Sequence, residues 1–199
     1  MSKVAIQGNA SGTGTFTIAA PNSNTDRTLT LPDGSATLAT TNGITVYDQW
    51  YLTTSLDNPG AGEVTITANL QRTSGNITGV GHIGSAMTLS SGVFTFPSTG
   101  MWLVRLEAHG TSTGDTSGHV NTAITTDNST YTNILKLDLG VANSGDPVRS
   151  VSGGEVLVDI TDTSTHKIKF VTDSMTATSL FGESTKIRTN FTFIRLGDT

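Results

Sequence analysis

The stretch Ser91-Gly-Val-Phe-Thr-Phe-Pro-Ser-Thr-Gly-Met-Trp-Leu-Val-Arg-Leu-Glu-Ala-His109 predicts two β-strands joined by a Pro/Gly turn. In its second half, alternate residues from Trp102 to Ala108 are apolar and predict a strand face that fills a core. The opposite face begins with Met101 and Leu103 and then becomes charged, so it also needs a cover. A second layer of the same chain or another copy of the chain could supply that cover. The second alternative favours an assembly protein over an enzyme.

Similar short runs, in which apolar residues alternate with Thr between turn residues, recur through residues 44–199. Helical periodicity is nearly absent, so the fold class is all-β. Ten strands are predicted, at residues 48–56, 63–70, 86–89, 93–96, 101–109, 119–126, 132–139, 155–161, 166–172 and 187–196. Strands of this length and spacing are typical of an antiparallel jelly-roll sandwich. The last strand has Phe191 and Phe193 on one side and Ile194 and Leu196 on the other, so we expect both of its faces to be covered.

Residues 1–43 contain four short apolar runs separated by turns. The inward candidates are too few to hold about 40 residues together without metal, disulfides or a partner chain. They are Ile6, Phe16, Ile18, Leu29, Leu31 and Leu38. We therefore expect a β attachment arm that folds against other subunits or orders only on a larger particle. Residues 44–199 would form the jelly-roll head domain.

The composition excludes several classes of function. The 199 residues include no Cys, which removes disulfide frameworks, thiolate zinc sites and cysteine nucleophiles. Only 14% are charged and the net charge is −5, which disfavours a nucleic-acid partner because such binding depends on Lys and Arg. No apolar run is long enough for a signal peptide or a membrane span, so we expect a protein made in the cytoplasm without membrane insertion.

The sequence offers little for catalysis, and we expect no catalytic residue, metal or cofactor. The glycines of residues 79–84 have dinucleotide-binding spacing, but a strand follows them where that motif needs a helix. His109 and His119 flank one loop, which offers too few further ligands for zinc. Glu107, Glu155 and Glu183 are scattered, whereas glycoside hydrolysis needs two acids in one cleft.

Three predicted loops, at residues 110–118, 141–154 and 173–184, are rich in groups that hydrogen-bond adaptably. Their candidate ligand contacts are Asp115, His119, Arg149 and Phe181. The aromatic ring of Phe181 could stack on a sugar or enter a neighbour's pocket, or it could lie under the loop and cover the end of the sandwich.

A family resemblance follows from the order of four segments: Trp50-Tyr51, Gly92-Val-Phe-Thr-Phe-Pro-Ser-Thr-Gly-Met-Trp102, Val156-Leu-Val-Asp-Ile160 with Lys167-Ile-Lys-Phe170, and Asn190-Phe-Thr-Phe-Ile-Arg-Leu196. Over residues 47–199 this order resembles the complement globular-head and tumour-necrosis-factor-like jelly rolls, in the form carried by bacteriophage fibre and virion surface proteins. Gly8-Asn-Ala-Ser-Gly-Thr-Gly-Thr-Phe-Thr-Ile18 and Asp26-Arg-Thr-Leu-Thr-Leu-Pro-Asp33 are similar to a module of tailed-phage fibre proteins.

The resemblance implies a homotrimer packed around a threefold axis through an apolar sheet face. The residues that we assign to this interface are Met101, Leu103, Arg105, Glu107, Phe191 and Phe193. Arg105 and Glu107 either pair across the interface or are simply solvated. The expected function is a non-enzymatic structural protein on the virion surface, either a capsid decoration protein or a short head fibre, whose partners are itself and the phage capsid or tail. The alternatives are a tail-fibre tip that binds a host-surface glycan or receptor and a polysaccharide-degrading spike.

Overall fold

The computed structural model describes residues 43–139 and 147–199, together with residues 11, 13, 17, 24–26 and 28. The chain divides into two units, Met1–Ala39 and Thr40–Thr199. The six residues assigned to the attachment arm, Ile6, Phe16, Ile18, Leu29, Leu31 and Leu38, lie outside the described residues. Among the residues that are described, no helix is long and apolar enough to cross a membrane.

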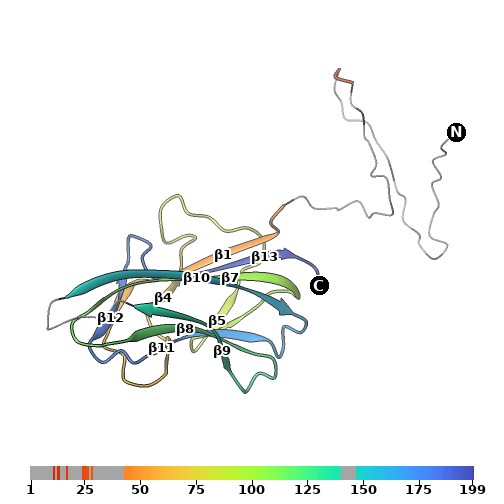
Figure 1. Cartoon of the computed structure of the whole chain (residues 1–199). Helices are drawn as coiled ribbons and strands as arrows, with labels where there is room; N and C mark the ends of the chain where they lie inside the picture. Colours follow the sequence, from red (N-terminus) through yellow and green to blue (C-terminus); the bar gives the residue numbers. More distant parts are fainter. Residues whose placement is uncertain are drawn as a thin grey trace. The chain divides into compact units, whose positions relative to one another are not determined.

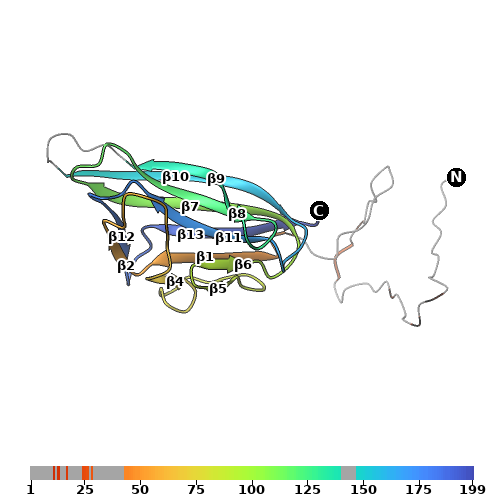
Figure 2. The same ribbon diagram turned by 90° about the horizontal axis from the view of Figure 1, so that it is seen from below.

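The second unit consists of two facing antiparallel sheets (Figure 1). The first sheet has the strand order β2-β12-β7-β13-β1-β4, and β10 pairs with β7. Its strands are β1 (Val46–Leu52), β2 (Thr54–Asp57), β4 (Leu70–Arg72), β7 (Gly100–Ser112), β10 (Val148–Ile160), β12 (Thr178–Glu183) and β13 (Asn190–Gly197). Figure 2 shows β10, β7, β13 and β1 side by side along the sandwich.

The second sheet has the strand order β5-β6-β11-β8-β9, and β3 pairs with β11. Its strands are β3 (Val64–Thr65), β5 (Thr88–Ser90), β6 (Val93–Thr95), β8 (Gly118–Thr125), β9 (Thr132–Leu139) and β11 (Lys167–Asp173). The two-layer antiparallel sandwich predicted from the spacing of the strands is therefore confirmed.

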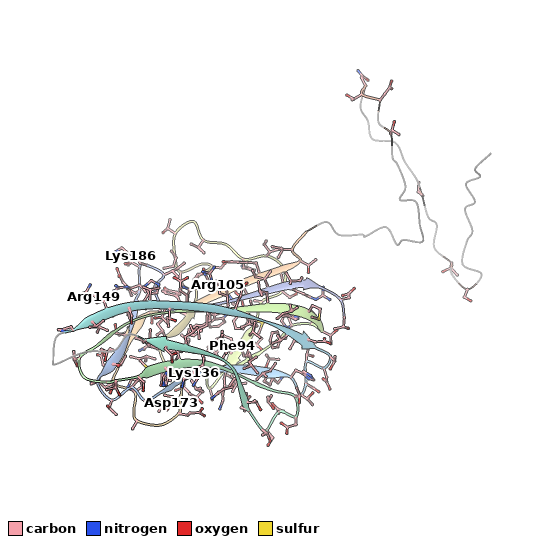
Figure 3. The ribbon with its side chains drawn as sticks, in the orientation of Figure 1. Phe94, Arg105, Lys136, Arg149, Asp173 and Lys186 are labelled. Carbon is pink, nitrogen blue, oxygen red and sulfur yellow. The ribbon has the colours of Figure 1, made fainter. Side chains whose placement is uncertain are left out.

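An aromatic cluster fills the space between the sheets. Phe94 lies between the two layers (Figure 3), with its ring centroid 5.3 Å from that of Trp50. Trp102 is fully buried, as the alternation in β7 predicts, and its ring centroid lies 5.2 Å from that of Phe96. Edge-on and tilted ring pairs of this kind add to the stability gained from burial alone. The rigid core fixes which residues of β7 face outward.

Two interface assignments are wrong. Phe191 and Phe193 were assigned to a subunit interface, but both are fully buried in the core of the single chain. The ring of Phe191 lies 4.2 Å from that of Phe170 on the opposite sheet. Both sides of β13 carry apolar residues, so the sequence alone could not tell its core face from its outward face.

The segment that decides the fold also differs from its prediction in one respect. β6 and β7 lie in different sheets, so the residues between them cross from one layer to the other and do not form a hairpin turn. The two-residue turn lies earlier, at Ser91 and Gly92, where β5 pairs with β6. Both turn residues have positive φ, 49° and 81°, which matches the twist of a tight hairpin.

Two predicted loops contain strands. β12 lies inside the loop expected at residues 173–184, and β10 begins at Val148, inside the loop expected at residues 141–154. Both strands pair with the far end of β7, which runs to Ser112. Backbone pairing along a long central strand outweighs the low strand propensity of their Ser and Gly residues. Arg149 and Phe181 consequently project from strands.

Candidate interaction surface

The outward face of the first sheet carries the remaining residues assigned to a subunit interface. Met101, Leu103 and Glu107 are half-buried on this face of β7, and Arg105 is exposed. They alternate with the buried core residues of the same strand, as a period of two requires. The structure therefore brings these four residues together on one surface.

An apolar row crosses this face from strand to strand. Tyr47 of β1 is opposite Ile194 of β13, Ile194 is opposite Leu103 of β7, and Leu103 is opposite Leu157 of β10. Leu157 is 52% exposed, and the other three are half-buried. Neighbouring strands lie about 4.8 Å apart, so the row extends about 14 Å. Four apolar side chains in register form a continuous surface, which scattered exposed residues would not.

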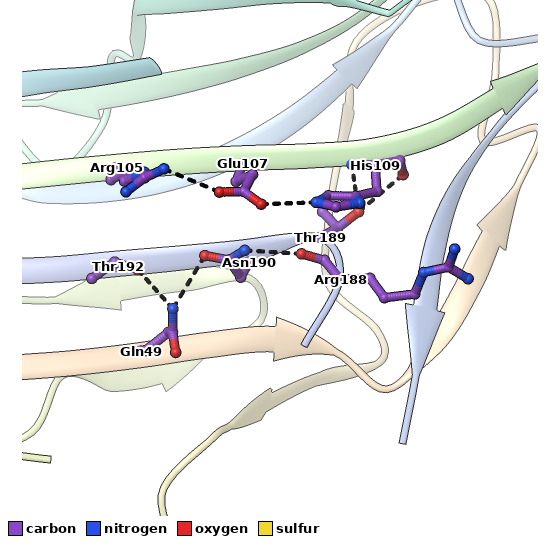
Figure 4. A network of polar contacts seen from close by, with 8 residues as sticks. All are labelled: Gln49, Arg105, Glu107, His109, Arg188, Thr189, Asn190 and Thr192. Carbon is purple, nitrogen blue, oxygen red and sulfur yellow. Dashed lines mark hydrogen bonds and ion pairs between the residues drawn. The ribbon is translucent and has the colours of Figure 1, made fainter. Parts of the chain in front are cut away.

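A polar network lies next to the apolar row (Figure 4). The Arg105 guanidinium lies 3.1 Å from one Glu107 carboxylate oxygen, and His109 Nε2 lies 2.8 Å from the other. Arg105 and Glu107 thus pair within one chain, which neither of the proposed alternatives included, and their place in a subunit interface stays a prediction. Because the pair is partly exposed, it contributes little to stability and mainly orders the side chains.

The network continues on β13 and β1. Gln49 Nε2 donates to Asn190 Oδ1 at 3.3 Å and to Thr192 Oγ1 at 3.2 Å. Asn190 Nδ2 donates to the carbonyl of Arg188 at 2.9 Å, which anchors the segment that leads into β13. These bonds fix the backbone of Arg188 beside the sheet.

At the far end of this face, a pocket of about 170 Å³ forms around Phe181. Phe181 is half-buried, with the guanidinium carbon of Arg188 4.5 Å and that of Arg149 5.6 Å from its ring centroid. The lining of this Phe181 pocket is His109, Arg149, Ser150, Val151, Phe181 and Arg188. Of the four candidate ligand contacts, the structure brings together Arg149 and Phe181.

Asp115 is occupied within the chain. Its carboxylate accepts hydrogen bonds from Thr176 Oγ1 at 2.6 Å, Thr178 Oγ1 at 2.7 Å and the Ala177 amide at 2.8 Å. Desolvation raises the pKa of Asp115, but these hydrogen bonds outweigh it and leave the pKa below its usual value. Asp115 therefore fastens the segment before β12 and does not belong to the Phe181 pocket.

His119 lies elsewhere too, on β8 of the second sheet, with its Nδ1 2.6 Å from an Asp138 carboxylate oxygen. His109 is on the first sheet, so the two histidines do not converge. In the part of the chain that is described, no group of three His, Asp or Glu side chains is placed to hold a metal ion.

Several residues of this surface were not assigned to any site from the sequence, among them Tyr47, Leu157, Ile194 and Arg188. The signal for Ile194 and Leu157 was present, because each is an apolar residue on the second face of a strand whose first face is also apolar. Nothing local marks Tyr47 or Arg188, whose positions depend on pairing between distant strands.

Comparison with known proteins supports the fold alone. No protein-family model matches this chain, and neither does any curated protein. Among solved structures, Eiger TNF from S. frugiperda is 13% identical with a TM-score of 0.56, over 79% of this chain and 96% of that one. Murine APRIL at pH 5.0 is 6% identical with a TM-score of 0.54, over 76% of this chain and 98% of that one. The chain has a tumour-necrosis-factor-like jelly-roll fold. The expected jelly-roll fold is thereby confirmed, whereas the relation to bacteriophage proteins stays a prediction.

Proposed function

We propose that the chain is a non-enzymatic structural protein that assembles as a homotrimer through the outward face of the first sheet. The apolar row of Tyr47, Ile194, Leu103 and Leu157 carries this proposal. A contiguous exposed apolar surface is unfavourable in water. Packing against another copy of the chain removes this surface from water and so stabilises the assembly. The tumour-necrosis-factor-like fold agrees with it, since the sequence resemblance implies a threefold assembly.

Within this proposal the jelly roll is a surface appendage of a bacteriophage virion, attached through the N-terminal arm. The support is the similarity of the segments at Gly8–Ile18 and Asp26–Asp33 to fibre modules, and the small number of apolar residues in the arm. As a capsid decoration protein or short head fibre, the trimer would sit on the shell. As a tail-fibre tip, it would present the head to a host-surface glycan, and the Phe181 pocket favours that second role.

Light scattering on the full chain tests the assembly. We expect a mass three times that of the 20.7 kDa chain at micromolar concentration. Leu157→Glu places a carboxylate in the apolar row and should shift the protein to monomers, because burying an unpaired charge is costly. Val64→Glu is the matched control: Val64 is also an exposed apolar residue, 40% accessible, but on the second sheet, so this variant should stay trimeric.

A monomeric native chain, or a Leu157→Glu variant that remains trimeric, would refute the proposed interface. The attachment role has its own test. Removal of residues 1–40 should leave a folded head that no longer joins particles, and labelled protein seen by electron microscopy would distinguish capsid from tail. Circular dichroism of the truncated chain checks the fold, and truncated protein that still joins particles would contradict an attachment arm.

A further inference from the structure

We propose that the Phe181 pocket binds the carboxylate of an acidic sugar residue. This inference names a ligand class for the tail-fibre alternative above and rests on that proposed function for its biological role. The residues that line the pocket belong to a single chain.

The first argument is the pairing of the arginines. The structure describes five, and three of these, Arg72, Arg105 and Arg195, pair with a carboxylate. Arg149 and Arg188 are the two without a carboxylate within salt-bridge distance among the described residues. In a chain with a net charge of −5, both converge on one ring. The pocket therefore brings together the two described arginines that pair with no carboxylate of the described residues.

Two acids on segments beside the pocket are already engaged within the chain. Glu107 binds Arg105 and His109, and Glu183 binds Lys186 at 2.8 Å. The pKa of the Glu183 carboxyl is lowered chiefly by its hydrogen bond from Lys186, and the charge of Arg188 adds to this from a greater distance. Within the part of the chain that the structure describes, no carboxylate forms an ion pair with either guanidinium group, which leaves both available to an external anion.

The second argument is the spacing of the two charges. Since both guanidinium carbons lie within 5.6 Å of the Phe181 centroid, they are at most about 10 Å apart. This is about one Debye length at roughly 0.1 M ionic strength, so their repulsion is only partly screened. A carboxylate between them would relieve that repulsion and accept paired N–H donors from a planar guanidinium.

The third argument is that the site is held in place. Arg149, His109 and Phe181 project from β10, β7 and β12, and the backbone of Arg188 is fixed by Asn190. Cation–π contact with Phe181 restricts both guanidinium groups before any ligand arrives. A site built on strands loses less conformational entropy on binding than one built on loops. In Figure 3, Arg149 and Lys186 both lie toward one end of the sandwich, away from Arg105.

The shape of the pocket favours a sugar acid over a free inorganic anion. At about 170 Å³ it is smaller than the roughly 300–1,000 Å³ of pockets for drug-sized ligands, so one ring or one small group fits. Val151, which is 64% exposed, and Phe181 form an apolar wall beside the charges. A phosphate ion has no apolar surface to place against this wall, whereas a sugar ring presents C–H groups.

Ligand-observed NMR on the full chain provides the test, with galacturonate, galactose and inorganic phosphate as probes. Galacturonate should bind saturably, and galactose and phosphate at least tenfold more weakly. Arg149→Gln and Arg188→Gln should each weaken galacturonate binding by about tenfold or more, the effect expected for one charge-assisted hydrogen bond. Lys136→Gln removes one positive charge from an exposed position on β9 of the second sheet, outside the pocket, so its affinity should stay within about twofold of the native value.

Equal binding of galacturonate and galactose would overturn the proposal, and so would phosphate binding as tight as that of galacturonate. An Arg188→Gln effect no larger than that of Lys136→Gln would show that only the overall charge matters, which also overturns it. Light scattering on the same samples separates the two hypotheses. A trimer that fails to bind refutes the pocket alone, whereas a monomer that binds refutes the assembly alone.

Discussion

Replacement of Asp48 by Ala should destabilise the head domain strongly. The Asp48 carboxylate is fully buried and accepts three hydrogen bonds, from Arg72 Nε at 2.9 Å, the Met87 amide at 2.9 Å and Trp50 Nε1 at 3.0 Å. Arg72 also donates to the Met87 carbonyl at 2.6 Å and lies over the Trp50 ring at 4.7 Å. The carboxylate therefore ties β1 and β4 to the segment that ends at Met87.

The magnitude follows from what remains after the substitution. Removing one partner of a buried ion pair typically costs about 3–5 kcal/mol, because the other charge stays buried and unpaired. The Arg72 side chain is 29% solvent-accessible, so water can partly solvate its charge. The cost should therefore lie near the lower limit, about 3 kcal/mol. For a chain of this size, that corresponds to a fall in Tm of about 6–12 °C.

Thermal and urea unfolding, followed by tryptophan fluorescence at one fixed protein concentration, measure the effect. Asp57→Ala removes an exposed carboxylate from β2 and should change the free energy of unfolding by at most about 0.5 kcal/mol. In the Asp48→Ala/Arg72→Met double variant, the orphaned charge is gone, so the loss should be smaller than the sum of the single losses. A cost below about 1 kcal/mol for Asp48→Ala, or strict additivity, would refute the reasoning.

Two further predictions concern the turn and the segment before β12. Gly92→Ala should lower the free energy of unfolding by more than about 1 kcal/mol, since φ is +81° and the new methyl group would lie 2.5 Å from the Ile66 carbonyl oxygen. Gly62→Ala, which meets nothing within 4 Å, is the control in urea denaturation. The lowered pKa of Asp115 means that its ionised form stabilises the fold above the pKa of an unfolded aspartate, about 3.9, and that this stability is lost as pH falls through the lower folded value. Asp115→Asn should therefore reduce Tm at pH 7 more than at pH 3, and an equal reduction at both would contradict the role of the carboxylate.

The sequence predicted the core face of β7 correctly, but it did not predict the core face of β13 or the strand β12. Alternation in β7 correctly placed Trp102, Val104 and Leu106 in the core, because three apolar residues at a period of two determine one face. It could not place Phe191 and Phe193, since both faces of their strand are apolar. β12 was missed because its Thr, Ser and Gly residues are typical of loops, and only its pairing with β7 makes it a strand.

The candidate surface shows the same limit. Met101 and Leu103 were predicted on the outward face because they alternate with core residues of their own strand. The Phe181 pocket draws on His109, Arg149 and Arg188, which the chain brings together only through pairing of β7 with β10 and β12 and through the turn into β13. No local pattern encodes such a meeting of distant segments. The loop composition nevertheless singled out Arg149 and Phe181 as candidates.

The outward face of β7 connects the two proposals. Leu103 lies in the apolar row and His109 in the Phe181 pocket, six residues apart on one strand, which corresponds to about 20 Å. Substitutions that far apart without shared partners usually act independently. If the two sites are not coupled, Leu157→Glu should leave galacturonate binding unchanged. Arg188→Gln should likewise leave the oligomeric state unchanged. If Leu157→Glu instead weakens galacturonate binding, the coupling must pass through a neighbouring copy, and the pocket would be completed by the assembly.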